Sequence, residues 1–128
     1  MVWTQKIYLP RFFEIEIFKY GYDDLKNYGN HALAVKVKLD GAPKYDYVIL
    51  FFSYETPIAL YDNREYVLYI DSGFISKTTE RHKKMVLEFV SGIVYGGPDI
   101  KETPYTHIER LFREKISERV AERIASYL

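Results

Sequence analysis

The first half of the chain alternates between apolar and charged residues, which is the pattern of strands that expose one face to water. In Phe13-Glu-Ile-Glu-Ile-Phe18 every second residue is charged, which predicts a strand over about residues 11–19. Leu33 to Leu39 alternates in the same way and predicts a second strand. The run from Tyr45 to Ser53 is apolar almost throughout, which is typical of a central strand buried on both faces.

Turn residues separate these segments from one another and from those that follow. Asp40 to Pro43 predicts a turn between the second and third strands. Two further strands, at residues 58–61 and 65–70, flank an Asp-Asn-Arg turn and predict another hairpin. Residues 23–26 could form one short helical turn. Residues 7–70 therefore predict a mainly antiparallel sheet of about five strands.

Beyond the sheet the apolar positions recur at the spacing of a helix. The first helical segment begins near Thr78, with Ser76 or Thr78 as its N-cap, and ends before Gly96-Gly-Pro98. A capping box at Thr106 and Glu109 predicts a second helix that extends to about residue 127. Strands followed by helices indicate an α+β fold. We expect a single domain in which the two C-terminal helices pack on one face of the sheet.

Charge and hydropathy narrow the class of protein. The chain carries 18 basic and 18 acidic residues, so no global field steers it to nucleic acid or to anionic membranes. The longest apolar run, Tyr47 to Phe52, is far shorter than a membrane span, and the N-terminus does not resemble a signal peptide. We therefore expect an intracellular protein, in the cytoplasm of its host and without membrane association.

Two features of the composition add to this picture. Asn and Gln are rare and Cys is absent, whereas Glu, Lys, Arg, Ile and Tyr are plentiful, which resembles the usage of hyperthermophile proteins. The 13 Tyr and 8 Phe residues are more than one small core needs. Tyrosine on a surface favours a partner interface, because it buries a large area and keeps a polar tip. We therefore expect a homodimer and a protein partner.

The sequence contains none of the common motifs of catalytic or cofactor sites. Without Cys there is no thiol nucleophile and no thiolate metal site. The glycine-rich phosphate loop, the Gly-x-Ser-x-Gly elbow and the His-Glu-x-x-His motif are also missing. His31, His82 and His107 lie in different predicted elements, away from a second ligand at suitable spacing. We therefore expect no metal, no cofactor and no catalytic residue, and an enzymatic function is less favoured than a binding function.

One dense polar cluster lies at the predicted start of the first helix. Its hydroxyls and cations, together with the free backbone N–H groups of a helix start, could hold a phosphate or a carboxylate. The same side chains could instead cap the helix and brace it on the sheet, with Arg81 paired to Glu55 or Asp71. The candidate anion-binding or nucleic-acid-binding residues are Thr56, Ser76, Lys77, Thr78, Thr79, Arg81 and His82.

A family resemblance covers about residues 50–90. Ser53-Tyr-Glu-Thr-Pro-Ile-Ala59, a hairpin, and then Ser76-Lys-Thr-Thr-Glu-Arg-His82 resemble a short domain of small phage, archaeal-virus and plasmid proteins. The pattern of that domain is Ser-Tyr-x-Thr-Pro-Val-Ala, a strand pair, and Ser-x-Thr-Thr-x-Arg/Lys-His. Here Ile58 replaces the usual valine, and the hairpin is longer than in the shortest members. The resemblance implies a viral or mobile-element origin and a family without an assigned activity.

Three classes of function stay open on these grounds. The first is a non-enzymatic viral interaction protein that acts as a homodimer through a tyrosine-rich surface. The second is a nucleic-acid-binding protein that uses the lysines and arginines near the first helix and exposed tyrosines. The third is a small nuclease or hydrolase built around His82, Arg81 and Glu55. The neutral charge counts against the second and the lack of a recognisable nucleophile against the third, so we favour the first.

Overall fold

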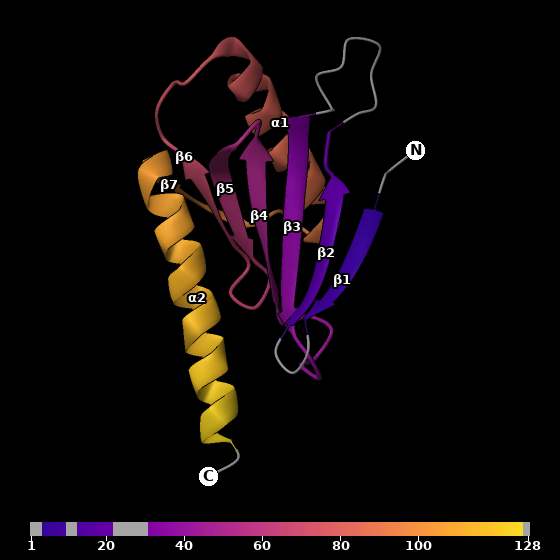
Figure 1. Ribbon diagram of the computed structural model, residues 1–128. Coiled ribbons are helices and arrows are strands. Elements are labelled where there is room, and N and C mark those ends of the chain that lie inside the picture. The colour runs from indigo at the N-terminus through magenta and orange to yellow at the C-terminus, as the bar shows by residue number, and fades with distance from the viewer. Residues whose placement is uncertain (1–3, 10–12, 22–30, 127–128) are drawn as a thin grey trace.

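A computed structural model describes residues 4–9, 13–21 and 31–126, and the helical turn expected at residues 23–26 lies outside them (Figure 1). The elements in chain order are β1 (Thr4–Leu9), β2 (Phe13–Lys19), β3 (Ala32–Leu39), β4 (Tyr47–Ser53), β5 (Thr56–Asp62), β6 (Val67–Asp71), α1 (Lys77–Ile93), β7 (Asp99–Thr103) and α2 (Tyr105–Ala125). All strands form one sheet in the order β1 to β7. Neighbouring strands are antiparallel except β6 and β7, which are parallel and joined through α1.

The α+β class and the antiparallel meander are confirmed, but the sheet has seven strands where the sequence predicts about five. The two additional strands are β1 and β7, at the two edges of the sheet. Thr4 to Leu9 has no clear alternation. Asp-Ile-Lys-Glu-Thr in β7 is exposed over most of its length, and such an edge strand has no apolar pattern to recognise.

The predicted capping box of the last helix is wrong. Helix α2 begins at Tyr105, with Pro104 in the N-cap position and without a side-chain cap. The backbone N–H of Tyr105 instead donates to the Asp71 carboxylate at 3.0 Å. The start of α2 is therefore fixed by a contact with the end of β6, which a local motif search cannot detect.

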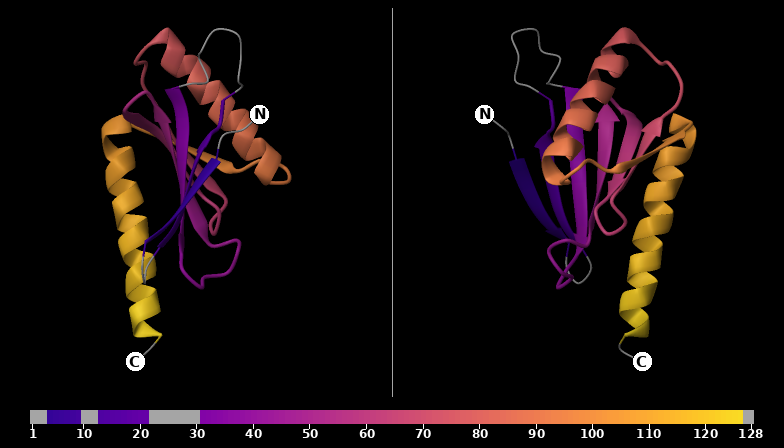
Figure 2. Two further views of the ribbon diagram at one scale, coloured as in Figure 1. Left: turned by 45° about the vertical axis from the view of Figure 1, so that its right-hand side comes forward. Right: turned by 180° about the vertical axis from the view of Figure 1, so that it is seen from behind.

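The two helices lie on opposite faces of the sheet, so the prediction that both pack on one face is also wrong (Figure 2). Val86 of α1 packs in one core with Phe51, whereas Ile108 of α2 packs in a second core with Leu50. The reason lies in β4, which carries apolar side chains on both faces of the sheet. A strand without a wet face needs a cover on each side.

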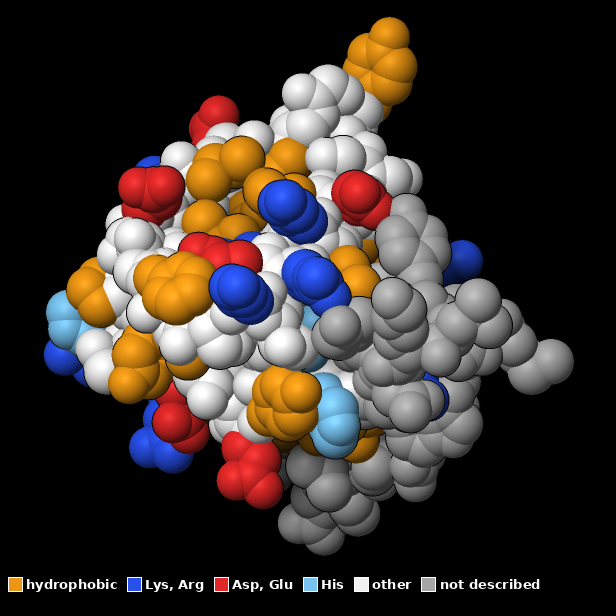
Figure 3. Space-filling model, turned by 90° about the horizontal axis from the view of Figure 1, so that it is seen from above, with side chains coloured by type: hydrophobic (Ala, Val, Ile, Leu, Met, Phe, Trp, Pro, Cys, Tyr) orange, Lys and Arg blue, Asp and Glu red, His pale blue; other side chains and the backbone are white. Residues whose placement is uncertain are grey.

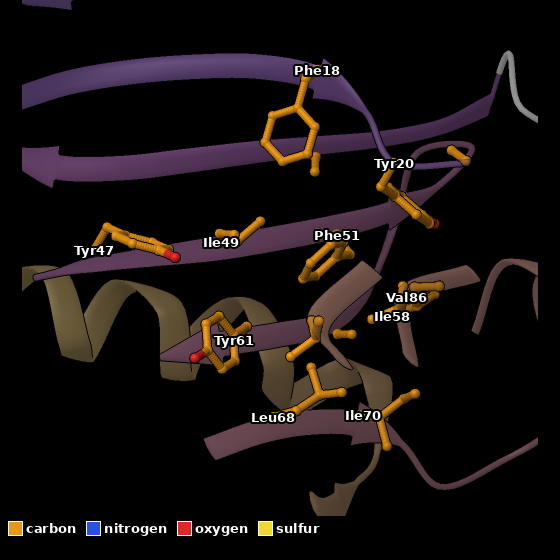
Figure 4. Packing of buried hydrophobic residues seen from close by; sticks show 14 residues of the cluster. Phe18, Tyr20, Tyr47, Ile49, Phe51, Ile58, Tyr61, Leu68, Ile70 and Val86 are labelled. Atoms are coloured by element: carbon orange, nitrogen blue, oxygen red, sulfur yellow. The ribbon is translucent and has the colours of Figure 1, made fainter. Parts of the chain in front are cut away.

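Aromatic rings fill the core beneath α1 (Figure 4). The Phe18 and Phe89 rings lie 5.2 Å apart, and Tyr20 meets Phe51 edge to face at 5.1 Å. Tyr61 is fully buried in the same core. Much of the aromatic excess in the sequence is therefore structural, because two cores rather than one must be filled.

A buried ionic cluster attaches α2 to the sheet. The carboxylate of Asp62, which is 1% exposed, accepts hydrogen bonds from Lys115 at 2.8 Å and from Arg119 at 2.7 Å. Arg119 also donates to Asp46 at 2.7 Å. Burial raises the pKa of Asp62, but the hydrogen bond from Lys115 and the charges of Arg119 and Lys115 outweigh burial and hold this pKa below its ordinary value.

We expect Asp62→Ala to lower the free energy of unfolding by about 3–5 kcal/mol, because two buried cations lose their common partner. Urea denaturation measures the change. Glu109→Ala, which removes an exposed pair with Arg113, is the control and should cost under about 0.5 kcal/mol. Equal losses in both variants would show that the cluster does not hold α2.

The same cluster predicts a dependence of stability on pH. Because the folded pKa of Asp62 is lowered, its contribution is fully present above the unfolded pKa and is lost as the pH falls through the folded pKa. The difference in unfolding free energy between wild type and Asp62→Ala should therefore shrink in acid. A difference that stays constant from neutral to acidic pH would contradict this account.

Candidate functional site

Ser76 is the N-cap of α1. Its hydroxyl accepts a hydrogen bond from the backbone N–H of Thr79 at 3.1 Å and also contacts the Thr79 hydroxyl at 3.0 Å. The extended backbone of Ser76 is the conformation that an N-cap requires. One free N–H group of the helix start is therefore already satisfied from within the chain.

Ser53, at the end of β4, connects this cap to the sheet. Its hydroxyl lies 3.0 Å from the Thr79 hydroxyl and 2.6 Å from Nδ1 of His82. Ser53 is 2% exposed, Thr79 3% and His82 0%. A hydrogen-bond chain of Ser76, Thr79, Ser53 and His82 thus connects α1 and β4, and it is buried except at Ser76. We name it the α1 brace.

The structure brings some of the predicted site residues together and separates others. Ser76, Thr79 and His82 meet in the α1 brace, while Lys77 and Arg81 are exposed on the outer side of α1. Thr78 is half-buried. Thr56 lies opposite Ser53 in the β4–β5 register, and it is Ser53 that contacts Thr79.

Asp71 does not pair with Arg81 in the way that one interpretation of the sequence expected. It lies 2.9 Å from the ammonium of Lys83, which also contacts Glu80 at 3.0 Å. Ser53 was absent from the candidate residues. The sequence feature that could have identified Ser53 is the first half of the recurrent pattern, Ser53-Tyr-Glu-Thr. There the serine is the last residue of a buried strand and stands directly before a tight turn.

The α1 brace contains a serine and a histidine at hydrogen-bond distance, which is the geometry of a nucleophile and its base. Both side chains are buried between α1 and the sheet, however, and a substrate cannot reach them without displacing the helix. Buried polar groups that satisfy one another fix the position of packed elements. The arrangement therefore favours a structural brace over hydrolysis.

Among the described residues, His, Asp and Glu do not form a group of three that could hold a metal ion.

A ring pair lies on the surface above the α1 brace. The rings of His31 and Tyr54 stack with centroids 4.2 Å apart and planes inclined by 17°. Tyr54 is 50% exposed, and its backbone is left-handed with φ 55°. Seen from above, Lys and Arg side chains gather near a histidine and a hydrophobic side chain, with Asp and Glu side chains next to some of them (Figure 3). This end of the molecule thus combines positive charge with an exposed aromatic surface.

An apolar groove of about 440 Å³ runs between α2 and the neighbouring strands. Its lining residues are Phe13, Ile15, Val37, Phe112, Arg113, Ile116 and Ser117. Helix α2 packs chiefly on β4, β5 and β6, so β2 and β3 extend beyond it. We name this surface the α2 groove.

Neither of the two described helices has the length and apolar content needed to cross a bilayer.

Comparison with known proteins identifies one family. The model of DUF8033, a family of unknown function, matches residues 13–96. No curated protein and no solved structure matches the chain. The matched residues extend from β2 to just beyond α1, so they include the complete α1 brace and exclude α2.

We expect Thr79→Val to lower the free energy of unfolding by about 1–3 kcal/mol, because the hydroxyls of Ser53 and Ser76 each lose a buried partner. Thermal unfolding measures the change. Ser91→Ala removes a hydroxyl from the exposed side of the same helix and should change stability by under about 0.5 kcal/mol. If both variants unfold like the wild type, the α1 brace does not hold the helix.

Proposed function

We propose that this chain, which belongs to the DUF8033 family, is a non-enzymatic interaction module that pairs with a second copy of itself through the α2 groove. One observation carries the proposal. The face of β2 and β3 beside α2 is apolar, and within the described residues α2 covers it only in part, since Phe13 and Ile15 stay half-buried.

The two faces of β2 and β3 differ sharply in chemistry. On one face Glu14 pairs with Lys38 at 3.2 Å, and Glu16 lies opposite Lys36, so charged residues satisfy one another in water. On the other face the alternate residues are apolar and either buried, as Val37 is, or half-buried, and they continue into the apolar side of α2. The first face also carries Phe18, which lies in the core under α1, in addition to these charged residues. The other face is apolar along most of both strands, which supports a buried role for it.

Charge supports a second copy as the occupant of the groove. The chain has no net charge, so two copies approach without overall repulsion. The exposed side of α2 carries pairs of both signs, Glu109 with Arg113 and Arg110 with Glu114. In a twofold dimer the same patch meets itself, and such a mixed patch can place opposite charges together around an apolar centre.

The proposed interface differs from the one expected from composition. The α2 groove is lined by phenylalanine and aliphatic side chains, whereas the exposed tyrosines, such as Tyr45, Tyr66 and Tyr95, lie elsewhere. These exposed tyrosines could contact a further protein partner.

The recurrent pattern at Ser53 and Ser76 supports a viral or mobile-element origin, and the composition supports a hyperthermophilic host.

We expect sedimentation velocity to give a particle of twice 15.2 kDa at submillimolar concentration. Ser117→Glu should weaken the dimer at least about tenfold, because it places a charge in the apolar interface. Ser117 is exposed and helical, so the fold should be retained. Far-UV circular dichroism checks this.

Ser91→Glu is the matched control, since Ser91 is an exposed serine on the other helix. It should leave the dimer unchanged. A wild-type particle of 15.2 kDa at every concentration would refute the proposal, and so would a dimer that both variants preserve.

A further inference from the structure

The ring pair of His31 and Tyr54 forms a rigid aromatic surface at the end of the molecule where α1 begins. The rings stack at 4.2 Å, and the backbone N–H of Tyr54 donates to the carbonyl of His31 at 2.9 Å. The Tyr54 ring also lies 6.0 Å from that of His82 in the α1 brace. The ring is therefore fixed by its neighbours although half of the residue is exposed.

Tyr54 adopts a conformation that is costly for its type. Its φ of 55° lies in the left-handed region, where a bulky residue is strained by about 1–3 kcal/mol. Glycine would form this turn without strain. The stack on His31 holds the exposed Tyr54 ring in place, so its outer face is available to a planar ligand.

Positive charge lies at the same end of the molecule (Figure 3). Lys77 and Lys84 are exposed and seven residues apart in α1, so they share one side of the helix. Neither lysine takes part in an ion pair within the described ranges. Asp71 and Glu80 both contact Lys83 instead. The two lysines are therefore available to an anionic ligand.

We infer that this end of the molecule binds single-stranded nucleic acid, with a base stacked on the Tyr54 and His31 rings and backbone phosphates on Lys77 and Lys84. Stacking on aromatic side chains accepts every base, and lysine supplies sequence-independent contacts to phosphate. The bases of a duplex stack on one another, so they cannot use the rings in this way. The inference is independent of the proposed dimer, since the α2 groove involves neither α1 nor the ring pair.

Fluorescence anisotropy with a labelled oligothymidine of about 12 nucleotides tests the inference at low salt. The full chain should bind this single strand more tightly than a duplex of equal length. Tyr54→Gly removes the ring and relieves the strained turn, and it should weaken binding about 5- to 150-fold. Lys77→Ala combined with Lys84→Ala should make the salt dependence of the binding constant shallower by about 1.4 in log–log slope.

Tyr66 provides a closely matched control. It has φ 58° and is 54% exposed, but it lies in the turn between β5 and β6, so Tyr66→Gly should leave binding unchanged. Lys44→Ala is the corresponding lysine control. The inference is overturned if the single strand does not bind, if the duplex binds as tightly, or if Tyr54→Gly and Tyr66→Gly have equal effects. Ser117→Glu should bind the single strand as the wild type does, which would show that nucleic-acid binding does not depend on the dimer.

Discussion

The burial of β4 and β5 on both faces determines where the two helices pack. Because β4 is apolar in both of its alternating sets, one helix must cover each face, and α1 and α2 take these two places (Figure 2). Within the part of the chain that the structure describes, two helices follow the meander. Helix α2 packs on β4, β5 and β6, so β2 and β3 extend beyond it. The α2 groove lies where this part of the sheet is not covered by the helix.

Each helix is held in place by a polar cluster as well as by its apolar contacts. The α1 brace connects α1 to β4 through hydroxyl groups and His82, while Asp62 holds Lys115 and Arg119 of α2. Apolar packing alone tolerates sliding of a helix, whereas buried polar groups must meet fixed partners. The α1 brace therefore also determines where Lys77 and the ring of Tyr54 emerge on the surface.

The sequence predicted the fold class and the central strands because alternation and apolar runs are local signals. It could not place the helices on opposite faces, since that depends on which residues of β4 face which core. It recognised Ser76, Thr79 and His82 as one group through their motif, but it did not select Ser53, which joins them from 23 residues away in the chain (76 minus 53). The strained turn at Tyr54 and the ring pair depend on φ and on spatial contact, for which the residue types alone give no signal.

Site-specific labelling shows whether a second copy covers the α2 groove. The chain contains no cysteine, so Ser117→Cys introduces a single thiol at the groove and Ser91→Cys a single thiol on α1. The rate of maleimide labelling is measured at micromolar and at submillimolar protein. We expect labelling of Ser117→Cys to slow at the higher concentration, because the second copy shields the thiol, while labelling of Ser91→Cys keeps its rate. Equal rates for Ser117→Cys at both concentrations would show that the groove stays open to solvent.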